Sequence, residues 1–401
     1  MTQSKTDTKS ILLTATGACL EWYEFSIFMY VTPMISRAFF PKQNHLIALL
    51  ASFGLLAAGY FMRPIGGMIF GNMGDKWGRK KILIITTGLM MIPMLGTALL
   101  PTYHQWGVTA VILLLLLRML QGLSVGGEYT SVLTMLLEQA PQKHRALTTS
   151  LASIVSGLGV VLSALVVTIL THFLGDQRMY AWGWRLPFAL GFVLSACAYF
   201  SQLKLHESPY FKEAAKQKKI TKTPIIHALK EHPRDIFYVF IMAGFLGIPC
   251  YLGLAFFSNY LITVFHMNKE SVMQITTLCD LIYLPFIPLA AYISDKVGRK
   301  PILIVTTILF IVTAYPAFTL INSQNLIHAL WGNSIILILY GCEVAIFVTM
   351  INELFPTEQR LSGMSTGYNV GNAIFGGTTP FVVTYFISHT GNHFAPAWYL
   401  A

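Results

Sequence analysis

Charged residues are scarce in this sequence. Asp, Glu, Lys and Arg together make up 11% of the 401 residues, whereas 55% are hydrophobic and the mean hydropathy is +0.61. A soluble domain needs far more charge on its surface, so this composition excludes that class. The sequence instead predicts an all-α, polytopic membrane protein.

Cysteines and catalytic motifs are also sparse. All five cysteines lie within apolar stretches without a paired spacing, which excludes a disulfide framework and a cysteine metal site. The sequence lacks a nucleophile elbow, a phosphate-binding glycine-rich loop and a His-Glu-x-x-His motif. We therefore expect no enzyme, no metal and no cofactor, and an ATP-driven pump is disfavoured.

Long apolar runs are abundant. Each has about 20 residues or more, which is enough for a helix to cross a bilayer. The runs are residues 11–37, 46–73, 80–100, 108–139, 146–173, 182–203, 235–264, 270–294, 300–320, 325–354 and 361–389. We expect eleven complete spans, and residues 395–401 predict the first turn of a twelfth span at which the chain is truncated.

The net charge of +10 could indicate a protein that binds nucleic acid, but the placement of the basic residues argues against such a partner. Twenty of the 27 Lys and Arg residues lie in segments that alternate spanning puts on one side of the membrane. Cytoplasmic loops collect such residues, so this side, with the N-terminus, is predicted to be cytoplasmic. Residues 204–234 predict a basic cytoplasmic linker between an N-terminal bundle (1–203) and a C-terminal bundle (235–401). A plain tether is the favoured role, and binding of anionic lipid headgroups is the alternative.

Two motifs occur twice at nearly the same spacing. Gly-Asn-Met-Gly-Asp-Lys-Trp-Gly-Arg-Lys-Lys at 71–81 returns in weaker form at 291–300, and Glu-Gln-Ala-Pro-Gln-Lys-His-Arg at 138–145 returns at 353–360. Parallel repeats of this kind are typical of transporters that rock two bundles about a central site. Basic cytoplasmic loops alone would explain the Lys and Arg, but not the repeated Gly, Asp, Glu and Pro.

The first motif predicts a cytoplasmic latch. Gly71 and Asp75 are four residues apart and share a helix face, so the glycine allows close helix approach. Asp75 can then accept hydrogen bonds from the N-terminus of another helix or from an Arg. Gly78 permits the tight turn, and Arg79 can pair with an acid such as Glu138.

The second copy predicts a matching latch, with Asp295, Glu353 and Arg360 as counterparts. Helix capping combined with loop topology is the alternative interpretation of both copies. The candidate gating residues are Gly71, Asp75, Gly78, Arg79, Glu138, Arg145, Asp295, Arg299, Glu353 and Arg360.

Ionisable residues inside the spans are the candidates for contact with cargo. A charge in hydrocarbon costs about 2.5 to 3.5 kcal/mol even on insertion scales, so it is rarely retained without a use. In the fourth span, Arg118, Gln121, Glu128 and Tyr129 fall on one helical stripe. Arg63 precedes a proline and can face either a cavity or its rim. The alternative is that these groups only pair with one another and hold the helices in register.

Polar groups in the eleventh span add uncharged donors and acceptors, which also suit contacts between helices. The candidate substrate-binding or proton-coupling residues are Glu21, Tyr23, Glu24, Arg63, Arg118, Gln121, Glu128, Tyr129, Tyr368, Asn369 and Asn372.

Several segments carry a family resemblance. Residues 71–81 resemble the loop signature of the major facilitator superfamily. Leu-Glu-Trp-Tyr-Glu-Phe at 20–25, Arg-Pro-Ile-Gly-Gly at 63–67, Gln-Gly-Leu-Ser-Val-Gly-Gly-Glu-Tyr at 121–129 and Trp-Gly-Trp-Arg-Leu-Pro-Phe at 182–188 narrow it to the metabolite:proton symporters. The resemblance implies two six-helix bundles, a monomer in a bacterial inner membrane, and the proton as coupling ion. It assigns proton transfer to Arg118 with Glu24 or Glu128.

The predicted function is import of a small solute by proton symport through alternating access. The arginines can bind a carboxylate, and Trp22, Tyr23 and Tyr129 can enclose a quaternary ammonium, so the solute is an organic acid or a zwitterion such as proline or betaine. The alternatives are a proton-coupled antiporter that exports small molecules and a transport-derived sensor. The fifth span lacks the Gly-Pro motif of many antiporters, which favours symport.

Overall fold

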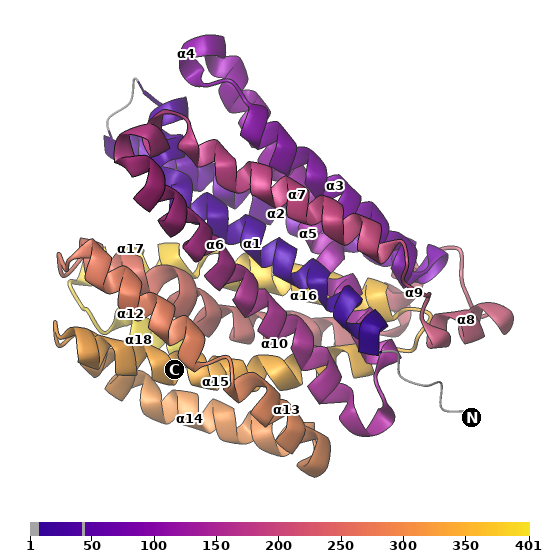
Figure 1. The fold of residues 1–401 in the computed structure, drawn as a ribbon. Coiled ribbons are helices and arrows are strands. Elements are labelled where there is room, and N and C mark those ends of the chain that lie inside the picture. Colours follow the sequence, from indigo (N-terminus) through magenta and orange to yellow (C-terminus); the bar gives the residue numbers. More distant parts are fainter. Residues whose placement is uncertain (1–7, 42–44) are drawn as a thin grey trace. The chain divides into compact units, whose positions relative to one another are not determined.

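Helices make up the regular structure of the chain. The computed structural model describes residues 8–41 and 45–401, and it contains no strand within these ranges (Figure 1). The elements of the first half are α1 (Thr8–Phe39), α2 (His45–Trp77), α3 (Arg79–Leu99), α4 (Tyr103–Trp106), α5 (Val108–Gln139), α6 (Arg145–Ala181) and α7 (Leu186–Gln202). Two short helices follow, α8 (Pro209–Lys216) and α9 (Pro224–Glu231).

The second half contains helices that are interrupted at several points. Its elements are α10 (Pro233–Cys250), the π-helix η3 (Tyr251–Phe256), α11 (Phe257–Thr263), α12 (Lys269–Ile282), α13 (Phe286–Val297), α14 (Arg299–Ile321), α15 (Leu326–Glu353), α16 (Arg360–Gly371), the π-helix η4 (Asn372–Gly376), α17 (Thr379–Thr390) and α18 (Ala395–Leu400).

Nine helical segments among the described residues are long and apolar enough to cross a membrane. They are Arg79–Leu99, Val108–Gln139, Gln142–Ala181, Gly183–Gln202, Pro233–Thr263, Lys269–Val297, Arg299–Ile321, Leu326–Glu353 and Arg360–Thr390. Helices α1 and α2, which are not among the nine, cover the first two predicted spans. The all-helical, polytopic fold class predicted from the sequence is confirmed.

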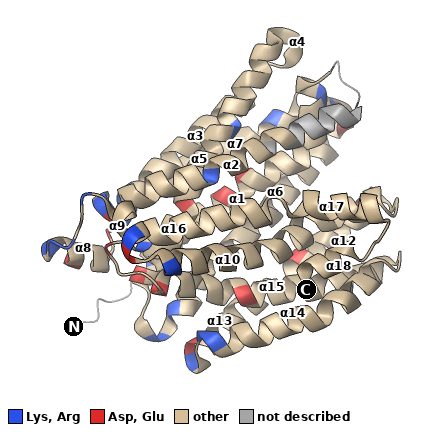
Figure 2. Ribbon diagram, turned by 180° about the vertical axis from the view of Figure 1, so that it is seen from behind, with Lys and Arg blue, Asp and Glu red and all other residues tan. Residues whose placement is uncertain are grey.

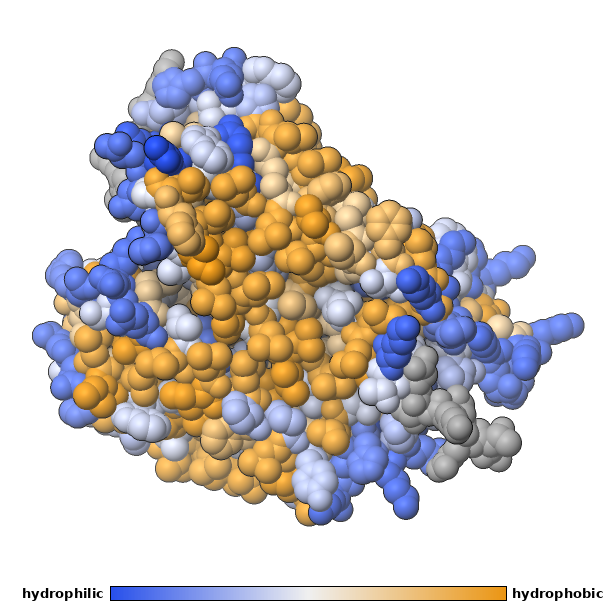
Figure 3. Space-filling view, viewed as in Figure 1, coloured by the Kyte–Doolittle hydropathy of each residue, from blue (hydrophilic) through white to orange (hydrophobic). Residues whose placement is uncertain are grey.

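The surface fits a lipid environment. Hydrophobic atoms cover the middle of the visible face and hydrophilic atoms gather at its margins (Figure 3). Large apolar side chains such as Phe61, Phe173 and Phe381 are more than 70% exposed. Lys and Arg lie mainly near helix ends and around α8 (Figure 2). This distribution is the one that the apolar runs and basic loops predicted.

Contacts divide the chain into two compact units. Unit 1 comprises Met1–Gln139, Val155–Pro233 and Phe355–Thr366, and unit 2 comprises Ala140–Ile154, Arg234–Leu354 and Gly367–Ala401. Each unit therefore includes a short segment from the opposite half of the sequence. Both segments contain the start of a helix, α16 for unit 1 and α6 for unit 2.

Helix α5 is central to unit 1, where it packs against α1, α2 and α3. The contact with α2 is close because glycines line it. A Cβ atom at Gly122 would collide with the carbonyl of Gly59, and one at Gly126 would collide with that of Arg63. This close packing brings the charged residues of α2 and α5 to the same part of the unit.

Unit 2 is built around α15, which packs against α12, α13 and α14. The backbone around it is irregular in three places. A π-helix, η3, extends α10, a non-helical step separates α12 from α13, and a second π-helix, η4, extends α16. Such irregular segments occur often at functional sites.

Candidate functional site

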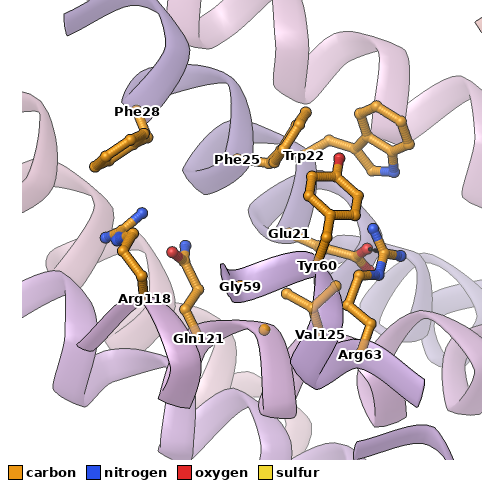
Figure 4. Close-up of a pocket in the computed structure, with 11 residues that line it drawn as sticks. Glu21, Trp22, Phe25, Phe28, Gly59, Tyr60, Arg63, Arg118, Gln121 and Val125 are labelled. Carbon is orange, nitrogen blue, oxygen red and sulfur yellow. Dashed lines mark hydrogen bonds and ion pairs between the residues drawn. The ribbon is translucent and has the colours of Figure 1, made fainter. Parts of the chain in front are cut away.

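A pocket in unit 1 collects most of the charged residues predicted from the sequence (Figure 4). Its empty volume is about 520 Å³, including its open mouth. Helices α1, α2 and α5 supply its walls. The lining residues are Glu21, Trp22, Phe25, Phe28, Gly59, Tyr60, Arg63, Arg118, Gln121, Gly122 and Val125.

One end of the pocket holds an ion pair. The Arg63 Nη2 atom lies 3.3 Å from Glu21 Oε1, and both side chains are less than 10% exposed. The guanidinium also lies 5.5 Å from the Tyr60 ring centroid. Arg63 thus faces the cavity, because the pair with Glu21 draws it inward. Glu21 Oε2 is enclosed without a hydrogen bond, which leaves one acceptor of this pair unused.

The other end holds an arginine without an acidic partner. Arg118 lines the pocket and is 4% exposed, yet within the described part of the chain it forms no ion pair. Its guanidinium lies 4.5 Å from the Phe28 ring centroid and donates to Thr97 Oγ1 at 3.3 Å. The Phe188 ring centroid lies 5.7 Å away. A buried cation that contacts aromatic rings and a hydroxyl but forms no ion pair is well suited to bind an anionic group.

Glu24 lies beside Arg118 and Gln121. It accepts hydrogen bonds from Ser195 Oγ at 2.8 Å and from Gln121 Nε2 at 3.3 Å, and it is fully buried. The three polar groups form a network that connects α1, α5 and α7. Protonation of Glu24 would therefore change the surroundings of the residues that line the pocket, Gln121 above all.

Aromatic side chains form the wall between the two ends. Trp22 and Phe25, and Phe25 and Tyr60, make edge-to-face contacts with ring centroids 6.0 and 5.4 Å apart. Figure 4 shows Phe25 and Tyr60 between the Arg118 end and the Glu21–Arg63 end. Sequence reasoning missed Phe25, Phe28 and Tyr60, although each lies three or four residues from a predicted charged residue and so shares its helix face.

Other candidate residues lie outside the pocket lining. Tyr23 is buried in the hydrophobic core of unit 1 and donates to the carbonyl of Pro187 at 3.0 Å. Glu128 is fully buried and accepts a hydrogen bond from Thr87 Oγ1 at 3.0 Å. Tyr129 is 4% exposed in the same unit. The stripe of polar residues that grouped Glu128 and Tyr129 with Arg118 follows α5 away from the pocket.

The candidates of the eleventh span belong to unit 2. Tyr368, Asn369 and Asn372 are all buried, and Asn372 Nδ2 lies 3.3 Å from the Tyr368 hydroxyl. Asn372 also begins the π-helix η4. These groups therefore form a polar cluster within unit 2. Within the described residues, no set of three or more His, Cys, Asp or Glu side chains is arranged to hold a metal ion.

The latch of unit 1 is centred on two buried charges. Asp75 accepts hydrogen bonds from the backbone N–H groups of Leu361, at 3.2 Å, and Ser362, at 2.7 Å, in the first turn of α16. Its carboxylate also pairs with Arg79 at 3.1 Å. A Cβ atom at Gly71 would lie 3.1 Å from the Leu361 carbonyl, which agrees with the predicted close approach. Gly78 adopts a φ of 103°, as the predicted tight turn requires.

Two arginines share Glu138 in the same unit. Arg79 Nε lies 3.2 Å from Glu138 Oε2, and Arg360 Nη1 lies 2.7 Å from Glu138 Oε1. We grouped Arg360 with Asp295 and Glu353 from the sequence, but its guanidinium binds Glu138. The reason is that α16 begins beside the first copy of the motif, so its first arginine meets the acid of that copy.

The linker completes this latch. Glu207 accepts hydrogen bonds from the N–H groups of Arg79, at 3.1 Å, and Lys80, at 3.2 Å, and so caps α3. The Phe211 ring centroid lies 4.9 Å from the Arg79 guanidinium carbon. Sequence reasoning treated this segment as a tether, because nothing local marks a carboxylate as the cap of a helix 128 residues away.

The latch of unit 2 repeats the first in outline. Asp295 accepts from the N–H groups of Ala146 and Leu147, both at 3.0 Å, in the first turn of α6. Arg299 pairs with Asp295 at 2.8 Å and with Glu353 at 3.5 Å, and Arg145 lies 3.4 Å from Glu353. Both motifs thus place an aspartate at the N-terminus of a helix from the opposite half of the sequence.

Comparison with known proteins places these features in a family. The family model of the Major Facilitator Superfamily matches residues 14–376. A putative proline/betaine transporter of Staphylococcus aureus (strain COL) is 33% identical over 402 residues, covering all of this chain and 86% of the relative. A glycine betaine/proline/ectoine/pipecolic acid transporter of Dickeya dadantii (strain 3937) is 29% identical, covering 98% and 80%. The fold is similar to that of a proton:xylose symporter, with a TM-score of 0.83 and 17% identity over 98% of this chain and 92% of the symporter.

Proposed function

Because the chain belongs to the major facilitator superfamily, we propose that it is a proton-coupled symporter that imports a small zwitterionic solute. It works as a secondary transporter in a bacterial inner membrane, with the latch motifs on the cytoplasmic side. The observation that carries the proposal is the pocket of unit 1, where Arg118 lacks an acidic partner and faces an aromatic wall. The names of the relatives, proline/betaine and glycine betaine/proline transporter, agree with such a solute.

The chemistry of the pocket suits opposite charges on one small molecule. The solute carboxylate binds Arg118, because a buried guanidinium without a carboxylate partner gains most from a charged acceptor. The ammonium group lies against Phe25 and Tyr60, whose ring faces attract a cation. Glu21, whose Oε2 has no hydrogen bond, is the acid among the lining residues and supplies the acceptor for that end.

Coupling to the proton is assigned to Glu24. Its carboxyl is linked through Gln121 to the pocket lining and lies on the same side as Arg118. Protonation of Glu24 removes the negative charge that competes with the solute carboxylate for Arg118. Solute and proton then bind cooperatively, which is the requirement for symport. In alternating access the pocket is open to only one side of the membrane at a time, and the two latches control its opening to the cytoplasm.

Uptake into liposomes tests this proposal. The purified full chain is reconstituted and given an inward pH gradient with labelled proline, glycine betaine, 2-oxoglutarate or xylose. We expect accumulation of a zwitterion that a protonophore abolishes. Accumulation of only the dicarboxylate or the sugar would contradict the assigned chemistry of the pocket, and outward transport would favour the antiport alternative.

Two variants separate binding from coupling. Arg118→Lys keeps the charge but loses the two-pronged donor geometry, so we expect a KM at least tenfold higher with little change in maximal exchange. Glu24→Gln should lose the part of the pH-driven accumulation that the Glu24 proton supplies, yet retain exchange of internal for external solute at equal pH. Tyr129→Phe, outside the pocket lining, is the matched control and should transport normally.

A further inference from the structure

The two units treat their buried acids differently. In unit 1, Glu21 pairs with Arg63, and Glu24 and Glu128 each accept a hydrogen bond from a hydroxyl side chain. The buried acids of unit 2 are Asp280 and Glu343, and its buried described side chains include no Lys, Arg or His. The spans of unit 2 therefore contain buried acid without a compensating cation.

Asp280 lies in the last turn of α12 and is 6% exposed. Its Oδ1 atom is enclosed without a hydrogen-bond partner. An ionised carboxylate in such a place is costly, because neither water nor a cation stabilises the charge. A proton on the carboxyl removes that cost, and the group can be ionised only when its surroundings change.

The backbone beside Asp280 is suited to such a change. Helix α12 ends at Ile282, and α13 begins only at Phe286 after a non-helical step. The π-helices η3 and η4 belong to the same unit. Broken helices in transporters commonly hold coupling-ion sites, because their helix ends and irregular segments rearrange between conformations.

The neighbouring titratable groups are neutral. On α12, Asp280 is next to Cys279, and Tyr283 follows directly after this helix. The Cys279 thiol accepts a hydrogen bond from Ser334 Oγ and donates one to the Leu330 carbonyl of α15. From α15, Tyr340 lies 6.1 Å from Tyr283 between ring centroids, and Cys250 of α10 is within electrostatic reach of Tyr283. From α11, Tyr260 donates to Asn322 and the His393 carbonyl instead. None of these groups is a cation that would hold Asp280 ionised.

Glu343 differs from Asp280 in its exposure. Glu343 is 1% exposed and both of its oxygens are enclosed without a hydrogen bond, whereas Asp280 is 6% exposed and its Oδ1 atom alone is enclosed in this way. Glu343 faces Thr306 and Thr307 of α14, whose hydroxyls already donate to backbone carbonyls of their own helix. A carboxyl that exchanges a proton in every cycle needs a route to water, so Asp280 is the better candidate.

We propose that Asp280 carries a second coupling proton, in unit 2, separate from the acids around the pocket of unit 1. The inference rests on the proposed proton symport. Hydronium on the outer side gives its proton to the Asp280 carboxylate and becomes water. On the inner side water accepts the same proton and the carboxylate is restored. One solute then enters with two protons, one on Glu24 and one on Asp280.

The number of coupled protons can be measured from the ratio of internal to external solute at which net flux stops. With the membrane potential clamped at zero, each coupled proton multiplies the equilibrium ratio of internal to external solute by about ten per pH unit. For the full chain in liposomes we expect net flux to vanish at a ratio of about one hundred at a gradient of one pH unit. Asp280→Asn should lower that ratio to about ten, whereas Asp280→Glu and the control Glu343→Gln should keep it at about one hundred.

Several outcomes would overturn the inference. A wild-type ratio of about ten, or an Asp280→Asn ratio equal to that of the wild type, contradicts a second proton while leaving proton symport intact. A wild-type protein that shows no pH-driven flux contradicts the proposed function itself, and with it the inference.

A spectroscopic measurement covers the case in which Asp280→Asn fails to transport at all. Infrared difference spectra of the purified protein between acidic and alkaline buffer should show the carbonyl band of a buried protonated carboxyl. The band assigned to Asp280 should be absent from Asp280→Asn and present in Glu343→Gln. An unchanged spectrum in Asp280→Asn would overturn the proposal without any reference to transport.

Discussion

The two latches share one motif but differ in how deeply they bury it. Arg79 in unit 1 is fully buried, and its side chain contacts two acids, two carbonyls and an aromatic ring. The equivalent Arg299 in unit 2 contacts two acids, and 19% of its side chain is exposed. The linker accounts for much of this difference, because Glu207 and Phe211 cover the first motif. Similar local sequences thus yield a buried network where a further segment covers the motif and a partly exposed network elsewhere.

Removal of the arginine should show the largest contrast. Arg79→Gln leaves Asp75 and Glu138 buried with less compensation, and breaking a buried pair in this way costs about 3 to 5 kcal/mol. Arg299→Gln breaks partly exposed pairs, each worth about 1 kcal/mol or less. Thermal unfolding of the purified variants should rank them in that order. Equal destabilisation would show that burial does not distinguish the two latches.

Neutralising the aspartates should open each latch separately. Asp75→Asn removes the charge that faces the N-terminus of α16, an effect of about 2 kcal/mol with its charged hydrogen bonds, and Asp295→Asn does the same for α6. The buried Ser365 in unit 1 and the buried Thr349 in unit 2 serve as positions for reporter cysteines in a cysteine-free background. We expect maleimide labelling to become roughly thirtyfold faster at the reporter of the affected unit.

Each of the two reporter cysteines also serves as the control for the other unit. Asp75→Asn should leave labelling at Thr349→Cys nearly unchanged if each latch mainly holds its own unit. Faster labelling at both reporters in both variants would mean that the latches open together, and the comparison between them would no longer separate the units.

The linker cap should have a smaller, local effect. Glu207→Gln weakens the cap on α3, which costs about 1 kcal/mol. Hydrogen exchange at the amides of Arg79 and Lys80 should therefore accelerate about fivefold. The exposed Glu213 in α8 of the same linker is the matched control, and Glu213→Gln should leave both amides as in the wild type.

Salt should produce the smallest change. The Debye length falls from about 10 Å at 0.1 M to about 3 Å at 1 M, so exposed pairs weaken while buried ones do not. Arg145 and Glu353 are each nearly 30% exposed. Raising KCl over this range should modestly accelerate exchange at Ala146 and Leu147 and leave Leu361 and Ser362 unaffected. Equal salt sensitivity at both helix starts would contradict the difference in burial.

Much of the latch geometry was predictable from local spacing. Gly71 and Asp75 share a face because they are one helical turn apart, and Arg79 follows at the next turn. The sequence therefore predicted an aspartate at a helix N-terminus and a pair with Glu138, as observed. The identity of that N-terminus was not predictable, because the Asp75 contact with Ser362 joins residues 287 positions apart.

The pocket was predictable in part. Glu21, Arg63, Arg118 and Gln121 were found because charge and polarity inside apolar runs are rare. The aromatic wall was missed because phenylalanine and tyrosine are common in spans and carry no such signal. Asp280 did carry the signal, as an acid in the middle of the run 270–294, and was overlooked because it belongs to neither repeated motif.

The sequence by itself determined the helical, membrane-spanning class and the duplicated motifs, because run length, hydropathy and spacing along one helix are local properties. Only the tertiary structure decided which acid Arg360 meets, that Arg63 faces the pocket, that the linker caps α3, and that Asp280 is enclosed without a cation. These outcomes depend on contacts between distant segments, where burial sets the strength of each charge, and no local pattern encodes that burial.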